Sequence, residues 1–150
     1  LFELLIYLIF FSNQFFLSWA KYVAEKTSIN GKYMNEGALS YKDDNWALSI
    51  VFYFMSSSAG SQTSNFNVGF LCEENPRNLI ANYIREDCMT KFFNQSIQIN
   101  PKHADPYALN KIGDYHYSEY KRNRNIFDSQ KAVELYLNAF VKGNQQVSYL

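Results

Sequence analysis

The sequence has 150 residues, about the length of one domain, and its 14 basic and 14 acidic residues give a formal net charge of zero. A neutral chain has no electrostatic footprint for nucleic acid or for an anionic membrane surface, so neither is expected as a partner. Aromatic residues make up 18% of the chain, which has only 6 Gly and 3 Pro, and this favours a packed domain over a disordered segment.

Residues 1–17 form an almost wholly apolar first segment, for which three interpretations stay open. They are the second helix of an incomplete preceding repeat, the core of a signal peptide, and a membrane span. Glu3 and the polar Ser12–Gln14 disfavour the span, whereas the repeat template derived below also fits this segment. We therefore expect residues 1–18 to be the helix of a truncated repeat, with a signal peptide as the alternative.

The rest of the chain predicts an all-α fold. Helices are expected near residues 15–39, 44–58, 62–72, 79–99, 106–120 and 128–142. No strand is expected, because apolar alternation is never sustained between turn signals. Asp105 and Pro106 are predicted to begin one helix as N-cap and first-turn proline, and Asp128 is predicted to cap the next. The polar, basic residues 121–125 between them are predicted to be a loop.

A long internal period relates three of these helices. Residues 49–57, 89–97 and 132–140 share packing positions at offsets 0, 3, 4, 7 and 8, the spacing of one helix face. The third copy consists of Ala132, Leu135, Tyr136, Ala139 and Phe140. The fourth offset is small in all three copies, as Ser56, Ser96 and Ala139, and the third is aromatic, as Tyr53, Phe93 and Tyr136. Gly60, Asn100 and Gly143 are the expected stops of these helices.

A second motif follows the first two stops. Ser64 to Gly69 reads S-x-x-x-V-G, and Ala108 to Gly113 reads A-x-x-x-I-G. Glycine inside a helix costs about 1 kcal/mol relative to alanine, so Gly69 and Gly113 are expected where a neighbouring helix approaches too closely for a side chain. Each unit is therefore predicted to be an antiparallel helix pair, and the chain an α/α solenoid.

This period divides the chain into one continuous solenoid domain. Repeats are expected over residues 19–60, 61–100 and 101–143, and residues 144–150 are expected to begin a further repeat.

The titratable residues predict no catalytic or metal site. His103 and Asp105, like Asp114 and His116, are two residues apart, and on a helix such side chains point in different directions. His116 is expected to be a partly buried packing residue. We expect no enzymatic activity, no cofactor, no metal and no small-molecule substrate.

Two further features concern the cellular compartment. Cys72 and Cys88 allow either a disulfide or free buried thiols, and the sequence leaves both open. Asn94-Gln95-Ser96 is a glycosylation sequon. Because the template places Ser96 on the packed face and Asn94 off it, a glycan on Asn94 is geometrically feasible if the chain enters the secretory pathway.

The repeated pattern resembles the Sel-1-like repeat, a relative of the tetratricopeptide repeat. The match rests on Asp128, Lys131 and Ala132, on the Tyr136, Ala139 and Gly143 that follow, and on the motif ending at Gly113. Lys111–Tyr117 and Trp19-Ala20 narrow the resemblance to the family's adaptors of endoplasmic-reticulum-associated degradation.

The resemblance implies a non-enzymatic protein–protein interaction scaffold in the endoplasmic reticulum, lumenal or membrane-associated. Its implied partners are a Hrd-type membrane ubiquitin ligase, lumenal lectins and misfolded client proteins. The alternative is a Sel-1-like scaffold in another signalling or secretion pathway, with a cytoplasmic location.

Overall fold

The computed structural model describes residues 29–147, and this range is helical throughout, with short connections. The helices are α2 (Ile29–Lys42), α3 (Trp46–Ser58), α4 (Gln62–Glu74), α5 (Asn82–Ile99), α6 (Pro106–Asn123) and α7 (Ile126–Val147), with the short 3₁₀ helices η1 (Pro76–Asn78) and η2 (Pro101–His103). The all-α prediction is confirmed for these residues. The interpretations placed on residues 1–28 and 148–150 lie outside the described residues. No helix within the described range is long and apolar enough to span a bilayer.

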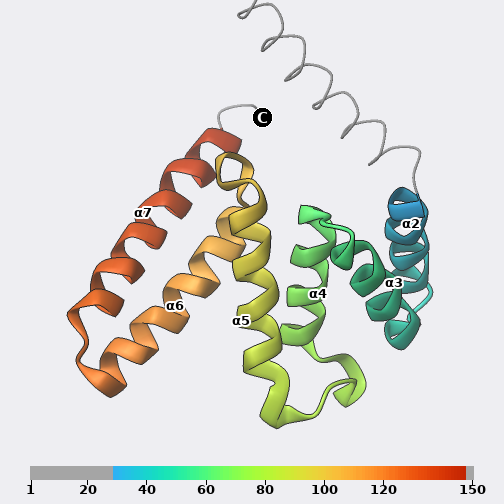
Figure 1. Cartoon of the computed structure of the whole chain (residues 1–150), viewed down its shortest axis with the longest axis horizontal. Coiled ribbons are helices and arrows are strands. Elements are labelled where there is room, and N and C mark those ends of the chain that lie inside the picture. Colours follow the sequence, from blue (N-terminus) through green and yellow to red (C-terminus); the bar gives the residue numbers. More distant parts are fainter. Residues whose placement is uncertain (1–28, 148–150) are drawn as a thin grey trace, which may run out of the picture.

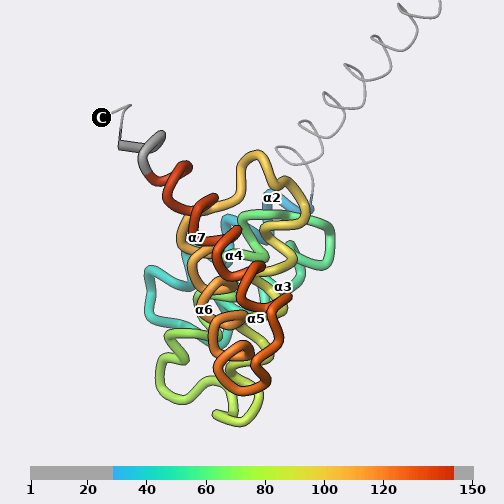
Figure 2. The backbone as a smooth tube through the Cα atoms, turned by 90° about the vertical axis from the view of Figure 1, so that its left-hand side faces the viewer, coloured from blue at the N-terminus to red at the C-terminus, as the bar shows by residue number. Residues whose placement is uncertain are grey.

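The six long helices of the described range follow one another across the molecule in chain order, as Figure 1 shows. Contacts are most extensive between α2 and α3, between α4 and α5, and between α6 and α7. Contacts of α3 with α4 and of α5 with α6 join these pairs. Figure 2 looks along the row from its α6–α7 end, so that the other helices lie behind these two.

At the start of α3, α4 and α6, a polar side chain accepts a hydrogen bond from a backbone N–H group that has no partner within the helix. Asn45 accepts from the N–H of Leu48 at 3.3 Å, and Ser61 accepts from that of Ser64 at 3.2 Å. Asp105 accepts from the N–H of Tyr107 at 2.8 Å, with Pro106 as the first helical residue. The predicted Asp105-Pro106 start is confirmed.

Two of the three predicted stops are confirmed and the third is wrong. Helix α3 ends at Ser58, just before Gly60, whose φ of +87° is accessible to glycine at low cost. Helix α5 ends at Ile99, with Asn100 as its C-cap. Helix α7, in contrast, passes through Gly143 to Val147. A single glycine weakens a helix without ending it, and here both neighbouring turns remain helical.

The predicted loop over residues 121–125 is also wrong. Helix α6 continues to Asn123, where Glu119 accepts hydrogen bonds from Arg122 at 2.7 Å and from Asn123 at 3.0 Å. The turn consists only of Arg124, with a φ of 54°, and Asn125, so that α6 and α7 run side by side in opposite directions (Figure 1). Local pairing along one helix face thus makes these polar residues helical.

Asp128 does not cap α7, because the helix begins two residues earlier. Asn125 takes that role and accepts the N–H of Phe127 at 3.0 Å. The Asp128 carboxylate instead lies 2.9 Å from Nδ1 of His116 on α6. The half-buried packing role predicted for His116 is confirmed, with this carboxylate as its partner.

A glycine faces an aromatic ring in each of the three helix contacts α2–α3, α4–α5 and α6–α7. A Cβ added to Gly37 would lie 2.8 Å from the Tyr53 ring, one on Gly69 2.8 Å from the Phe93 ring, and one on Gly113 2.8 Å from the Tyr136 ring. Real Cβ atoms do not approach other atoms so closely, so the rings occupy the space of the missing side chains. The predicted packing role of Gly69 and Gly113 is confirmed, and Gly37 adds a third case.

The apolar interior consists of two clusters that share α5. Phe92 packs with Tyr53, Val68, Leu71 and Cys72 of α3 and α4. Phe93, the next residue, packs into the second cluster, whose other members are Ala104, Ala108, Leu109, Ile112, Leu135 and Ala139. The predicted packing residues Ser56, Ser96, Ala108, Ala132 and Ala139 are all buried.

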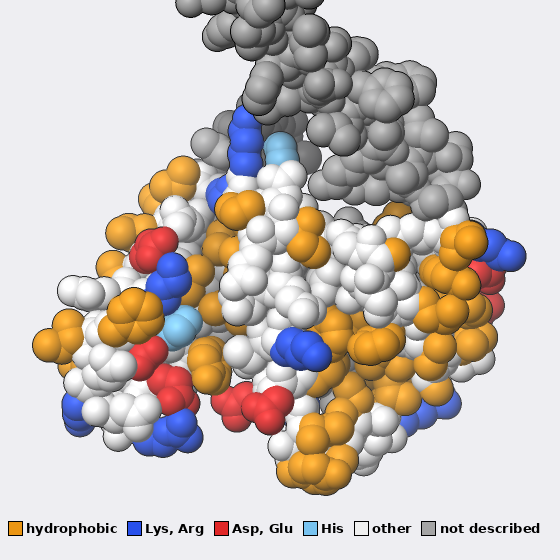
Figure 3. Space-filling view, viewed as in Figure 1, with side chains coloured by type: hydrophobic (Ala, Val, Ile, Leu, Met, Phe, Trp, Pro, Cys, Tyr) orange, Lys and Arg blue, Asp and Glu red, His pale blue; other side chains and the backbone are white. Residues whose placement is uncertain are grey.

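Phe140 departs from the predicted packed face, because 66% of its surface is exposed. Its counterparts in the template are Ser57, which donates a hydrogen bond to Asn65 of α4 at 2.9 Å, and Ile97, which packs against the second cluster. This template position therefore faces the helix that follows, and no helix follows α7 in the described part of the chain. Figure 3 shows apolar side chains gathered over the α2–α3 end of the molecule and along α7.

The glycine–aromatic contact predicts opposite effects for the same substitution at two glycines. Gly69→Ala is expected to destabilise the protein by about 1–3 kcal/mol, because the Phe93 ring is fully buried and has no space to move into. Gly143→Ala is the matched control. It lies within α7 with nothing within 4 Å of an added Cβ, so helix propensity should stabilise it by up to about 1 kcal/mol.

Urea denaturation of the two variants and the wild type measures both effects. A Gly69→Ala variant as stable as Gly143→Ala would show that the ring does not exclude a side chain.

Candidate functional site

A pocket of about 400 Å³ with aromatic walls is the best-formed concave site that we find among the described residues. Helices α2, α3, α4 and α6 all contribute to it. Its lining consists of Tyr41, Tyr53, Phe66, Asn67, Phe70, Leu71 and Tyr107. Apolar concave sites of this size, with few polar groups, are the usual form of a ligand pocket.

Helix α4 supplies the centre of the pocket. Phe66 and Phe70 are four residues apart and so share one face of the helix. The Tyr107 ring, in the first turn of α6, lies with its centre 6.2 Å from that of Phe66 and 6.4 Å from that of Phe70. The Asp105 cap fixes the start of α6 and with it the place of Tyr107. Local helix geometry therefore places Phe66 and Phe70 on one face of α4, and the packing of α6 near this face adds the Tyr107 ring.

The Tyr53 ring adjoins the pocket from the interior and is 6% exposed. It is the same ring that fills the space beside Gly37. Burial raises the pKa of Tyr53, the nearby Tyr41 raises it further, and a hydrogen bond with the Asn67 side chain lowers it. Tyr53 is the one predicted packing residue that also lines the pocket.

Glu73 connects α4 to α6 beside the pocket. One carboxylate oxygen accepts the Tyr107 hydroxyl at 2.7 Å, and the other pairs with the Lys111 ammonium group. The Arg85 guanidinium donates to the Glu73 backbone carbonyl. The hydrogen bond with Glu73 is the main cause that raises the pKa of Lys111, whereas burial is the main cause that raises that of Tyr107, followed by Glu73.

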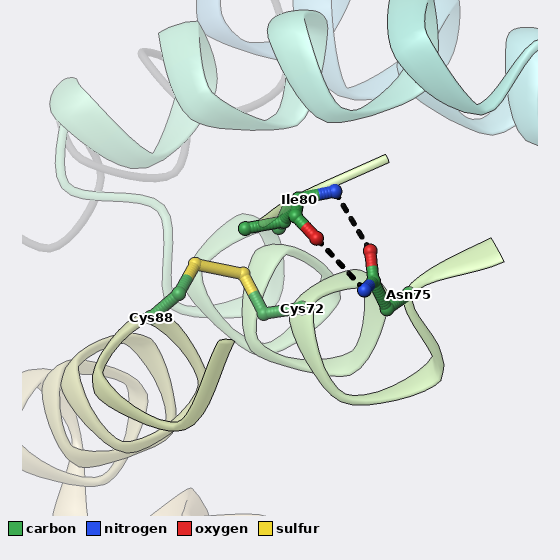
Figure 4. Close-up of a disulfide and its surroundings, with 4 residues drawn as sticks. All are labelled: Cys72, Asn75, Ile80 and Cys88. Carbon is green, nitrogen blue, oxygen red and sulfur yellow. Dashed lines mark hydrogen bonds between the residues drawn. A yellow bond between two sulfur atoms is a disulfide. The ribbon is translucent and has the colours of Figure 1, made fainter. Parts of the chain in front are cut away.

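A disulfide between Cys72 and Cys88 connects α4 to α5, as Figure 4 shows, and Cys72 directly precedes Glu73 in the chain. The two Cα atoms are 5.9 Å apart, within the usual range for disulfides. This decides between the two thiol states that the sequence left open. Nearby, the Asn75 side chain donates to the carbonyl of Ile80 at 2.9 Å and accepts its N–H at 2.7 Å, so the α4–α5 connection is fixed as well.

The remaining predicted residues lie away from the pocket. Gly113 and Tyr136 meet between α6 and α7, where the Tyr136 hydroxyl donates to Asp114 at 2.7 Å. Burial and then this hydrogen bond raise the pKa of Tyr136 to about 12. Asn94 is exposed on α5 while Ser96 is buried, as the template predicted. In the described part of the chain, nothing lies within 4 Å of a Cβ added at Gly143.

Most residues that line the pocket were not predicted from the sequence. None of Tyr41, Phe66, Phe70 and Tyr107 was predicted to line a binding site, and the pairing of Glu73 with Lys111 was not predicted. Among the described residues, no group of three or more His, Cys, Asp or Glu side chains is placed to hold a metal ion.

No family model matches the sequence, and no solved structure matches it at a significant level.

Reduction of the disulfide is expected to lower the free energy of unfolding by about 2–4 kcal/mol, because the bond closes a loop between cysteines 16 residues apart. Urea denaturation with and without reductant measures the change. The Cys72→Ala/Cys88→Ala double variant should be insensitive to reductant. Identical midpoints for the wild type under both conditions would contradict a stabilising role.

Tyr136 predicts a loss of stability in alkaline solution. Its pKa is about 12 in the folded state, against about 10 for an exposed tyrosine, so the folded state keeps the proton that the unfolded state releases. This contribution is complete below about pH 10 and is lost as the pH rises towards about 12. Tyr136→Phe should show a smaller decline in unfolding free energy over this range. Tyr83→Phe, at a ring that is 86% exposed, should retain the wild-type decline.

Proposed function

We propose that the protein is a non-enzymatic scaffold for protein–protein interaction, built as a solenoid of antiparallel helix pairs. The observation that carries this proposal is the threefold glycine–aromatic contact, Gly37 with Tyr53, Gly69 with Phe93, and Gly113 with Tyr136. The same contact at the same place in three successive helix pairs supports a repeated unit. Stacked helix pairs produce extended surfaces that suit protein ligands.

The contacts between the helix pairs support the same view. Glu73 of α4 accepts a hydrogen bond from the Tyr107 hydroxyl of α6 at 2.7 Å, and its other carboxylate oxygen pairs with Lys111 of α6. The Ser64 hydroxyl of α4 donates to Ser56 of α3 at 2.7 Å. Each pair is therefore anchored to its neighbour by polar contacts, as a scaffold of fixed shape requires.

The titratable side chains with shifted pKa values also fit a structural role. The Tyr107 hydroxyl and the Lys111 ammonium group, both on α6, bond to the Glu73 carboxylate of α4, and the Tyr136 hydroxyl of α7 bonds to Asp114 of α6. Tyr107, Lys111 and Tyr136 thus each bond to a carboxylate on another helix. This supports a protein whose polar groups stabilise its architecture, in place of one that performs a reaction.

For the cellular role we propose an adaptor in endoplasmic-reticulum-associated degradation that docks on a Hrd-type membrane ubiquitin ligase. The resemblance to Sel-1-like adaptors is the origin of this proposal. The Cys72–Cys88 disulfide supports it, because such bonds persist in oxidising compartments and are rare in the cytosol. The exposed Asn94 of the sequon is compatible with a lumenal location.

Affinity purification of the full-length chain from cells in mild detergent, followed by mass spectrometry, tests this role. We expect an endoplasmic-reticulum membrane ubiquitin ligase and lumenal quality-control proteins among the partners. Recovery of cytosolic partners alone would favour the general scaffold in another pathway.

Glycosylation of Asn94 in the same cells tests whether the chain enters the lumen of the endoplasmic reticulum. We expect an endoglycosidase-sensitive mobility shift that Asn94→Gln abolishes and that Asn35→Gln, at an exposed asparagine outside any sequon, leaves in place. An unglycosylated chain that protease digests in unpermeabilised microsomes would contradict a lumenal location.

A further inference from the structure

We propose that the aromatic pocket binds one large uncharged side chain, of the Phe, Leu, Ile or Met class, presented by an extended segment of a partner protein. This inference rests on the proposed function, because it names the part of a partner that the scaffold holds. The size of the pocket, its charge and its place among the helices point to this occupant.

The size and lining of the pocket suit a single apolar anchor. Its volume of about 400 Å³ lies near the lower end of the range for ligand sites, roughly 300–1,000 Å³. The rings of Phe66, Phe70 and Tyr107 form its aromatic wall, and such rings favour burial of apolar surface. A large side chain with its adjacent backbone fits this space, whereas a whole helix, about 10–12 Å across, is too wide to enter it.

The charge of the site selects an uncharged occupant. None of the residues that line the pocket in the described structure carries a formal charge at neutral pH. Glu73 bonds to Tyr107 of the pocket wall, and both of its carboxylate oxygens are already engaged, one by Tyr107 and the other by Lys111. An ionic side chain would therefore lose its hydration without gaining a free partner.

A cage of aromatic rings also suits a cation such as a methylated lysine, but the surroundings disfavour it here. Lys111 lies 5.1 Å from the centre of the Tyr107 ring and so already occupies one face of that ring. Arg85 adds a second positive charge beside Glu73. These two cations already engage the Glu73 carboxylate and backbone carbonyl, so a further cation in the pocket would find neither of them free.

The place of the pocket favours an extended segment. Its walls come from α2, α4 and α6, the first helices of three successive pairs, together with Tyr53 of α3. A segment lying across these helices would pass Asn67, whose side-chain amide has two donor hydrogens and an acceptor oxygen. The hydrogen bond with Tyr53 uses only part of this capacity. An amide of this kind can hydrogen-bond to the backbone of a bound segment.

Peptides with one variable position test this occupant. The probes are acetyl-Gly-Ser-Gly-X-Gly-Ser-Gly-amide with X as Phe, Leu, Glu, Lys or trimethyl-lysine, titrated to millimolar concentration into the isotope-labelled full chain. We expect the Phe and Leu peptides to shift the amide resonances of Phe66, Asn67 and Phe70 and the other three to shift them little. The variants are Tyr41→Ala and Phe70→Ala, with Tyr83→Ala as control at an exposed tyrosine outside the pocket.

Both pocket variants should lose the shifts caused by the Phe peptide, whereas Tyr83→Ala should keep them. Tyr41 is 38% exposed at the end of α2, so its variant tests the pocket even if Phe70→Ala unfolds, and the spectrum of each variant reports its fold. Preference for Lys or trimethyl-lysine, or no shift with any peptide, overturns the proposed occupant. Recovery of the expected partners from cells together with a silent pocket would reject this inference alone and leave the scaffold proposal standing.

Discussion

The packing of an aromatic ring against a glycine is the contact on which the rest of the structure depends. Where Gly69 meets the fully buried Phe93, a side chain would lie 2.8 Å from the ring, so the two helices can approach this closely only because the glycine has none. Because packed interiors leave no spare volume, the Phe93 ring fills the space that a side chain at position 69 would need. Gly37 of the α2–α3 pair is held by an additional contact, in which the buried Ser49 hydroxyl donates to the Gly37 carbonyl at 2.9 Å.

Helix α5 joins the two apolar clusters of the interior, because it contributes residues to both. Phe92 and Phe93 are neighbours in sequence but pack into different clusters, so the helix has an apolar contact on two sides. The half-buried Met89 packs against both clusters and lies between them. A displacement of this helix would therefore disturb both clusters at once.

The sequence predicted the parts of this fold that recur. Gly69 and Gly113 were predicted because each has a small residue five positions before it and an apolar residue directly before it. Gly37 has Lys32 and Glu36 at these two positions, so it does not fit the motif and was missed. The extension of α6 to Asn123 was missed for another reason. Its last turns are polar and look like a loop, but pairing of Arg122 with Glu119 supports a helix there.

The pocket could not be predicted from the period, because it joins residues that the repeat does not relate. Tyr41 ends α2, Phe66 and Phe70 lie within α4, and Tyr107 begins α6, so their proximity depends on how three helix pairs stack. Only the spacing of Phe66 and Phe70 carried a local signal of a shared face. Residues on the interior face were thus predictable, while those on the surface between pairs were not.

Two adjacent residues of α4 make this surface rigid where the pocket lies. Cys72 is bonded covalently to α5, and Glu73 bonds to Tyr107 and Lys111 of α6, so α4 is fixed on both sides directly after Leu71 of the pocket wall. A wall fixed in this way loses little conformational freedom when a ligand enters, and preorganisation of this kind favours binding. Because one of the two connections is a disulfide, the rigidity of the pocket depends on the same oxidising conditions that the proposed lumenal role requires.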